Sequence, residues 1–166
     1  MSIRLPKFSK LSLFAAALFL VIGTAQSDAR QHGSRHSAQD YQRIQNRWKP
    51  KEYLHVEHGD VESGSIKPGW WSAMWAIEEV DGYVRFQNKF RPGEYLNIEH
   101  GSLELGPIKP GWWSAMWTLD QAQEGYVRIC NRWREGVCIH IEHGEVEAGE
   151  VEDGWWSAMW RLSPAE

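Results

Sequence analysis

Apolar and polar residues alternate with a period of two along most of the chain after residue 40, which indicates β-strands. In the middle of the chain the alternating apolar pairs are Val84 and Phe86, Leu96 and Ile98, Leu103 and Leu105, and Trp113, Ala115 and Trp117. Glycine- and proline-containing turns separate these runs, at 91–93, 100–101 and 109–111. This part of the chain is therefore predicted to form four short strands.

The same pattern occurs three times, which is the mark of an internal repeat. The repeats are 41–82, 83–125 and 126–166, and each contains Gly-Trp-Trp-Ser-Ala-Met-Trp. Three four-stranded units are too few for a propeller, which typically has at least four blades. They can close a threefold barrel that leaves no sheet edge exposed. We therefore expect one all-β domain over 41–166, with apolar trios in its core: Ile44, Phe86 and Ile129; Leu54, Leu96 and Ile139; Trp75, Trp117 and Trp160.

Three motifs carry a resemblance to a known family: the openings 44–46, 86–88 and 129–131, the second strands at 53–54, 95–96 and 138–139, and the closing tryptophans. They resemble the β-trefoils and, among these, the ricin-B-type lectin domains. The resemblance covers 41–166 and implies a pseudo-threefold β-trefoil of three repeats of four short strands. The family usually closes with Gln-x-Trp, and here Ala73, Ala115 and Ala158 replace the glutamine. The family's sugar-binding aspartate follows the second-strand leucine, where this chain has His55, Asn97 and His140.

The first 25 residues have the pattern of a signal peptide. Arg4, Lys7 and Lys10 precede an apolar stretch at 11–22 that is short for a membrane span, although an uncleaved anchor is the alternative. Residues 26–40 are polar and are expected to be a flexible leader. We expect an exported protein, secreted or periplasmic, with no stable membrane insertion after cleavage.

Charge argues against one class of partner, and composition points to candidate binding residues. The chain has a net charge of −4 and no cluster of lysine and arginine after residue 40, so we expect no nucleic-acid partner. It also has 11 tryptophans. Trp71, Trp113 and Trp156 share the period of the closing tryptophans and are predicted to lie in the core. Trp70, Trp112 and Trp155 point the other way and are candidate stacking platforms.

Polar residues on the second strands suggest a binding site in each repeat. Alternation predicts outward-facing pairs: His55 and Glu57, Asn97 and Glu99, and His140 and Glu142. Carboxylate, amide and imidazole groups bind sugar hydroxyls, and an aromatic ring covers the apolar face of a pyranose. We therefore predict a module that binds a glycan or polysaccharide at repeated shallow sites. The third site is expected to be the weakest, since Glu152 and Asp153 replace the Lys-Pro pair of the other repeats.

The alternatives are a protein-interaction β-trefoil, such as a protease inhibitor, and a structural envelope protein. The loops 48–51, 90–93 and 133–136 are variants of one another, which favours repeated small ligands over one protein partner. Enzyme activity is not expected, because an active site needs one asymmetric constellation and these groups recur in triplicate.

We expect neither a metal site nor a cofactor. The segments 55–58 and 140–143 each contain two histidines three residues apart. On a strand such residues face opposite sides and cannot easily share an ion.

The only two cysteines, Cys130 and Cys138, fall on adjacent strands joined by a short turn. A register that pairs them also places Gln45 opposite Tyr53 and Gln87 opposite Tyr95. Because an exported protein meets oxidising conditions, we predict a disulfide.

Overall fold

A computed structural model describes residues 40–166 and shows twelve β-strands there. The predicted signal peptide and all but the last residue of the leader lie outside the described residues. The first repeat contains β1 (Tyr41–Asn46), β2 (Tyr53–Glu57), β3 (Asp60–Gly64) and β4 (Trp75–Val80). The second contains β5 (Tyr83–Asn88), β6 (Glu94–Asn97), β7 (Glu104–Pro107) and β8 (Trp117–Gln121). The third contains β9 (Val127–Asn131), β10 (Val137–Glu142), β11 (Glu145–Glu150) and β12 (Trp160–Pro164).

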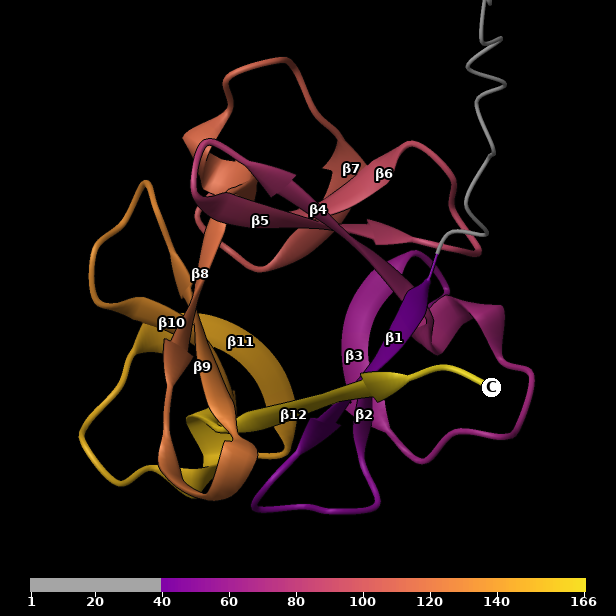
Figure 1. The fold of residues 1–166 in the computed structure, drawn as a ribbon, viewed down its shortest axis with the longest axis vertical. Coiled ribbons are helices and arrows are strands. Elements are labelled where there is room, and N and C mark those ends of the chain that lie inside the picture. Colours follow the sequence, from indigo (N-terminus) through magenta and orange to yellow (C-terminus); the bar gives the residue numbers. More distant parts are fainter. Residues whose placement is uncertain (1–39) are drawn as a thin grey trace, which may run out of the picture. The chain divides into compact units, whose positions relative to one another are not determined.

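The first and fourth strands of the three repeats form a closed barrel. Antiparallel pairs run β1–β4, β4–β5, β5–β8, β8–β9, β9–β12 and β12–β1, so the ring returns to its starting strand. The second and third strands form three hairpins, β2–β3, β6–β7 and β10–β11. Strands β2, β6 and β10 join these hairpins to β1, β5 and β9 of the barrel. Figure 1 shows the three units arranged around a central axis. This architecture confirms the predicted β-trefoil.

Short 3-10 helices interrupt the repeats between the hairpins and the fourth strands. They are η1 (Trp71–Ala73), η2 (Trp113–Ala115) and η4 (Trp156–Ala158), and a fourth, η3 (Gln123–Gly125), lies in the connector before β9. None of the helices in the described part of the chain is long and apolar enough to cross a membrane.

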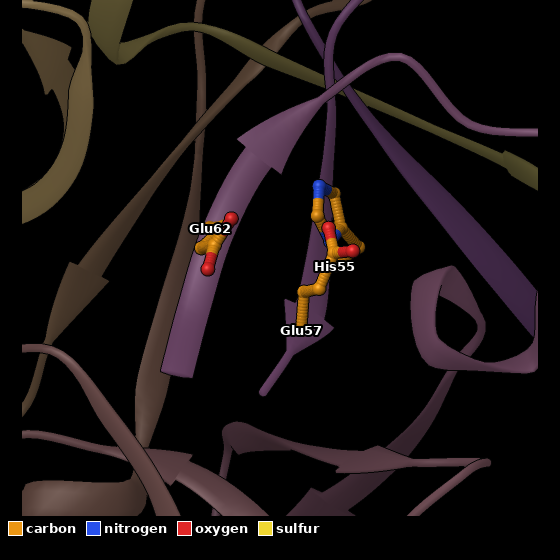
Figure 2. Close-up of side chains that lie close together, drawn as sticks. All are labelled: His55, Glu57 and Glu62. Carbon is orange, nitrogen blue, oxygen red and sulfur yellow. The ribbon is translucent and has the colours of Figure 1, made fainter. Parts of the chain in front are cut away.

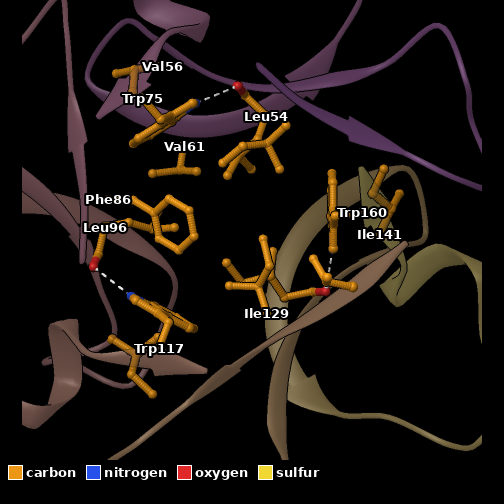
Figure 3. Packing of buried hydrophobic residues seen from close by; sticks show 14 of the residues in the cluster. Leu54, Val56, Val61, Trp75, Phe86, Leu96, Trp117, Ile129, Ile141 and Trp160 are labelled. Atoms are coloured by element: carbon orange, nitrogen blue, oxygen red, sulfur yellow. Dashed lines mark hydrogen bonds between the residues drawn. The ribbon is translucent and has the colours of Figure 1, made fainter. Parts of the chain in front are cut away.

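The core consists of the predicted apolar trios. All nine side chains have no exposed surface: Ile44, Phe86, Ile129, Leu54, Leu96, Ile139, Trp75, Trp117 and Trp160. Each closing tryptophan donates a hydrogen bond from its indole Nε1 to the carbonyl oxygen of the second-strand residue of its own repeat (Figure 3). The donor–acceptor distances are 2.9 Å from Trp75 to Leu54, 3.0 Å from Trp117 to Leu96 and 2.8 Å from Trp160 to Ile139. Burying these indoles therefore leaves no indole N–H unsatisfied.

The predicted disulfide joins Cys130 of β9 to Cys138 of β10, which are directly opposite in the strand register. The other two repeats have the predicted pairs at the same place, Gln45 opposite Tyr53 and Gln87 opposite Tyr95. In both, the glutamine Nε2 donates to the tyrosine hydroxyl, at 3.2 Å and 3.0 Å. One repeat thus uses a covalent bond where the other two use a hydrogen bond.

Candidate functional site: three aromatic clefts

Three equivalent clefts lie where one repeat meets the next. Each is lined by the second-strand glutamate, the Trp-Trp-Ser segment of the same repeat, and an aromatic residue of the following repeat. Cleft 1 contains Glu57, Trp70, Trp71, Ser72 and Phe90. Cleft 2 contains Glu99, Trp112, Trp113, Ser114 and Trp133. Cleft 3 contains Glu142, Trp155, Trp156, Ser157 and Trp48, so the first repeat completes the last cleft.

The clefts concentrate the exposed aromatic surface of the molecule. Six large hydrophobic side chains are exposed within residues 40–166, each by 51–61% of its surface, and all six line the clefts, two in each: Trp71 and Phe90, Trp113 and Trp133, Trp48 and Trp156. The cleft volumes are about 510, 490 and 330 Å³ for clefts 1, 2 and 3. An open cleft with aromatic walls and one carboxylate can hold a small, partly apolar ligand that carries hydroxyl groups.

The exposure of Trp71, Trp113 and Trp156 contradicts the sequence prediction, which placed them in the core. The cause is the 3-10 helix, which replaces the expected extended strand. In repeat 1 the amide of Met74 donates to the carbonyl of Trp71 at 3.0 Å, which is the i to i+3 bond of this helix. The three-residue period turns Trp71 outward and brings Ala73, Met74 and Trp75 inward.

A buried asparagine holds the two walls of each cleft together. Nδ2 of Asn88 donates to the carbonyl of Ser72 at 2.9 Å, and its Oδ1 accepts from the amide of Phe90 at 3.0 Å. Asn131 makes the same contacts to Ser114 and Trp133, and Asn46 bonds to Ser157 and Lys49. Since all three side chains are buried, these bonds position the loop aromatic relative to the helix that carries the exposed tryptophan.

A cation from the following repeat stacks on each exposed tryptophan of the 3-10 helices. Lys89 Nζ lies 5.0 Å from the Trp71 ring centre and 4.5 Å from that of Tyr41. Arg132 lies between Trp113 and Tyr83 in the same way, and Arg47 between Trp156 and Tyr126. A cation over an exposed ring contributes about 0.5–1 kcal/mol, so it helps to orient the indole while the ring stays more than half exposed.

His55, Asn97 and His140 lie on the strand face opposite the barrel core, but they are buried there, so the prediction that they are exposed is wrong. They are only 3%, 2% and 3% exposed. The edge of the Trp70 ring covers His55 with ring centres 6.0 Å apart, and Trp155 covers His140 at 5.9 Å. In repeats 1 and 3 the second strand is therefore covered on both faces, by the barrel core and by these half-buried tryptophans.

Glycines on the third strands make room for the buried polar residues. A Cβ at Gly64 would lie 3.0 Å from Nε2 of His55, and one at Gly149 would lie 2.9 Å from Cε1 of His140. Gly106 holds the equivalent place beside Asn97, with more space. The recurrence of glycine at this position is the sequence signal that the alternation pattern missed.

The predicted glutamates and the predicted stacking tryptophans, which directly precede the 3-10 helices, do reach the clefts. Glu57, Glu99 and Glu142 each line one cleft, and so do Trp70, Trp112 and Trp155. The carboxylate of Glu99 accepts a 2.6 Å hydrogen bond from the Ser114 hydroxyl. The sequence prediction missed the exposed tryptophans of the 3-10 helices and the loop aromatics.

No protein-family model matches the chain, and no curated protein matches it. Among solved structures, a GlcNAcα1-4Gal-releasing endo-β-galactosidase from Clostridium perfringens shares 35% sequence identity at a TM-score of 0.70, over 76% of this chain and 33% of the enzyme. The designed threefold-symmetric protein ThreeFoil matches at 20% identity and a TM-score of 0.63, over 74% of this chain and 96% of ThreeFoil. SeviL, solved with asialo-GM1 saccharide, matches at 18% identity and a TM-score of 0.63, over 76% of this chain and 98% of SeviL.

The fold and the three clefts define a β-trefoil protein that resembles ricin-B-type lectin domains. This chain spans about a third of the endo-β-galactosidase, whereas it matches nearly the whole of ThreeFoil and SeviL.

Proposed function

We propose that this protein is a carbohydrate-binding protein that uses the three aromatic clefts as separate glycan sites. The observation that carries the proposal is the placement of the exposed aromatic side chains, all six of which line the clefts in residues 40–166. Aromatic rings stack on the apolar face of a sugar ring, and Glu57, Glu99 and Glu142 supply acceptors for its hydroxyl groups.

Two comparisons support a sugar ligand. SeviL binds the asialo-GM1 saccharide, and the Clostridium perfringens enzyme acts on a glycan that contains GlcNAcα1-4Gal. These two saccharides are the first probes to test, followed by a glycan array. The signal-peptide pattern of the first 25 residues supports a location outside the cytoplasm, where such ligands occur.

Each cleft is open, so each is expected to bind weakly, and the repeated sites give avidity for a polymer or a decorated surface. Cleft 3 is expected to be the weakest. It is the smallest of the three, and the acidic pair Glu152 and Asp153 lies just before its Trp155.

Calorimetric titration of the purified protein with a glycan that it binds tests the proposal. Trp71→Ala and Trp113→Ala should each remove about one site from the stoichiometry, and so should Glu57→Ala and Glu99→Ala. Glu142→Ala should change it little. Glu79→Ala is the matched control, because Glu79 is exposed on β4 and lines none of the clefts. An unchanged stoichiometry after loss of both Trp71 and Trp113, or no binding to any glycan of the array, would contradict the proposal.

A further inference from the structure

Two hairpins bring an imidazole and two carboxylates together. In the first repeat these are His55, Glu57 and Glu62, shown in Figure 2, and in the third they are His140, Glu142 and Glu147. In each group the ligand atoms all lie within 4.8 Å of one another. The histidine and the first glutamate are two residues apart on one strand and share a face. The second glutamate is the direct cross-strand partner of the histidine, Glu62 opposite His55 and Glu147 opposite His140.

The charges of these groups are unbalanced without a cation. Two carboxylates close together repel each other. Within the described part of the chain, none of the four glutamates forms an ion pair with a lysine or arginine. A bound divalent cation would neutralise both carboxylates at once.

The third repeat holds its histidine as a metal ligand is usually held. Nδ1 of His140 lies 3.2 Å from the carbonyl oxygen of Cys138. A proton on Nδ1 can bond to that oxygen and leaves the Nε2 lone pair free to bind a metal. Nε2 lies 3.3 Å from a Glu142 oxygen and 4.0 Å from a Glu147 oxygen. A protonated Nε2 carries one hydrogen for these two carboxylates, whereas a metal ion binds both.

The first repeat supplies an independent observation, a buried ring nitrogen without a partner among the described residues. His55 is 3% exposed, and its buried Nδ1 has no hydrogen-bond partner among residues 40–166. A buried ring nitrogen without a partner is costly, by about 1–3 kcal/mol, and calls for an explanation.

The second repeat lacks the group. Asn97 stands in place of the histidine, and both ends of its side chain bond to nearby backbone, the carbonyl of Tyr95 and the amide of Glu99. The two glutamates also have other partners, Ser114 for Glu99 and His100 for Glu104. This repeat shows which side chain the strand accepts in place of the histidine.

We propose that the first and third repeats each bind one divalent transition-metal ion such as Zn²⁺. The ligands are a ring nitrogen of His55 with the carboxylates of Glu57 and Glu62, and Nε2 of His140 with those of Glu142 and Glu147. Mixed nitrogen and oxygen ligands suit such ions, and three protein ligands leave a fourth position for water. Bonds of about 2.0–2.2 Å require the glutamate side chains to move inward by about 1 Å, which partly exposed side chains can do.

The sequence expectation of no metal site considered the two histidines of each segment, and these indeed point apart. His58 and His143 are exposed at the hairpin turns, whereas His55 and His140 are buried. Each proposed site also takes one glutamate, Glu62 or Glu147, from the neighbouring strand, and the prediction from the two histidines did not consider it.

Calorimetric titration of the metal-free purified protein with Zn²⁺ alone tests the proposal, and because no sugar is present its outcome is independent of the proposed function. Two equivalents are expected to bind. His55→Asn and His140→Asn should each remove one equivalent, and the double variant should remove both. Asparagine is the native residue at this position in repeat 2, so these variants are expected to fold, which circular dichroism checks.

The matched controls are His58→Asn and His143→Asn, which should retain two equivalents. Glu147→Gln should weaken one equivalent at least about tenfold. Its side chain is 49% exposed, so this variant supplies the test if a histidine variant does not fold. An unchanged stoichiometry in the double histidine variant, unchanged affinity in Glu147→Gln, or equal losses in the controls would overturn the proposal.

Discussion

The indole Nε1 of Trp117 donates a 3.0 Å hydrogen bond to the carbonyl oxygen of Leu96, and both side chains are fully buried. The bond connects the fourth strand of the barrel to the hairpin strand that leads to cleft 2. The same contact in the other two repeats ties each hairpin to the barrel.

Trp117→Phe should destabilise the protein by about 3 kcal/mol, because it removes the indole donor and leaves a cavity in the core. Denaturant unfolding measures the loss. Trp113→Phe is the matched control from the same repeat, since Trp113 is 51% exposed, and it should change stability by less than about 0.5 kcal/mol. Similar losses for the two variants would mean that the core assignment is wrong.

Asn88→Ala should lower the stability by about 2 kcal/mol, because the carbonyl of Ser72 and the amide of Phe90 both lose their buried partner. It should also loosen cleft 1, and quenching of tryptophan fluorescence by acrylamide measures that change. Glu79→Ala, an exposed substitution on β4, should leave both quantities unchanged. Unaltered quenching in Asn88→Ala would show that the asparagine does not position the cleft.

Removing the disulfide by Cys130→Ser and Cys138→Ser should cost at most about 2–3 kcal/mol, since the loop that it closes is short. A pair with Cys130→Gln and Cys138→Tyr copies the other repeats and should recover part of that loss through the Gln–Tyr hydrogen bond. Denaturant unfolding compares the variants. In the wild-type protein, alkylation and mass spectrometry should find no free thiol, and two free thiols would refute the disulfide.

Stability should fall as the pH rises above about 10, in part because of Tyr95. Burial, followed by the charge of Glu78, raises the pKa of the Tyr95 phenol above its ordinary value. The neutral phenol contributes its full stability below the unfolded-state pKa of about 10, and that contribution is lost as the pH rises through the folded-state pKa. Tyr95→Phe should therefore lose less stability than the wild type between about pH 9 and 11. Identical pH profiles in unfolding experiments would contradict the assignment.

The sequence alone determined the three-repeat barrel, the nine side chains of the core trios and the pairing of the first and second strands. The apolar alternation selects one face of every strand, so Ile44, Phe86 and Ile129 have no other place than the core. The same register predicts the Cys130–Cys138 disulfide, because residues opposite each other on adjacent strands are fixed by the turn between them. The buried face of each strand and the residue opposite each cysteine both follow from the two-residue period of neighbouring strands.

Only the tertiary structure decided where the site lies. Alternation cannot show that a 3-10 helix turns Trp71 outward, since the helix changes the period from two to three. It also cannot show that His55 is covered by Trp70, because the covering ring comes from a segment after the hairpin. Trp48 and Trp156 lie near opposite ends of the described chain and meet in one cleft only because the barrel closes on itself. Strand alternation reports which side of a strand faces the core, and the packing of distant segments determines what covers the other side.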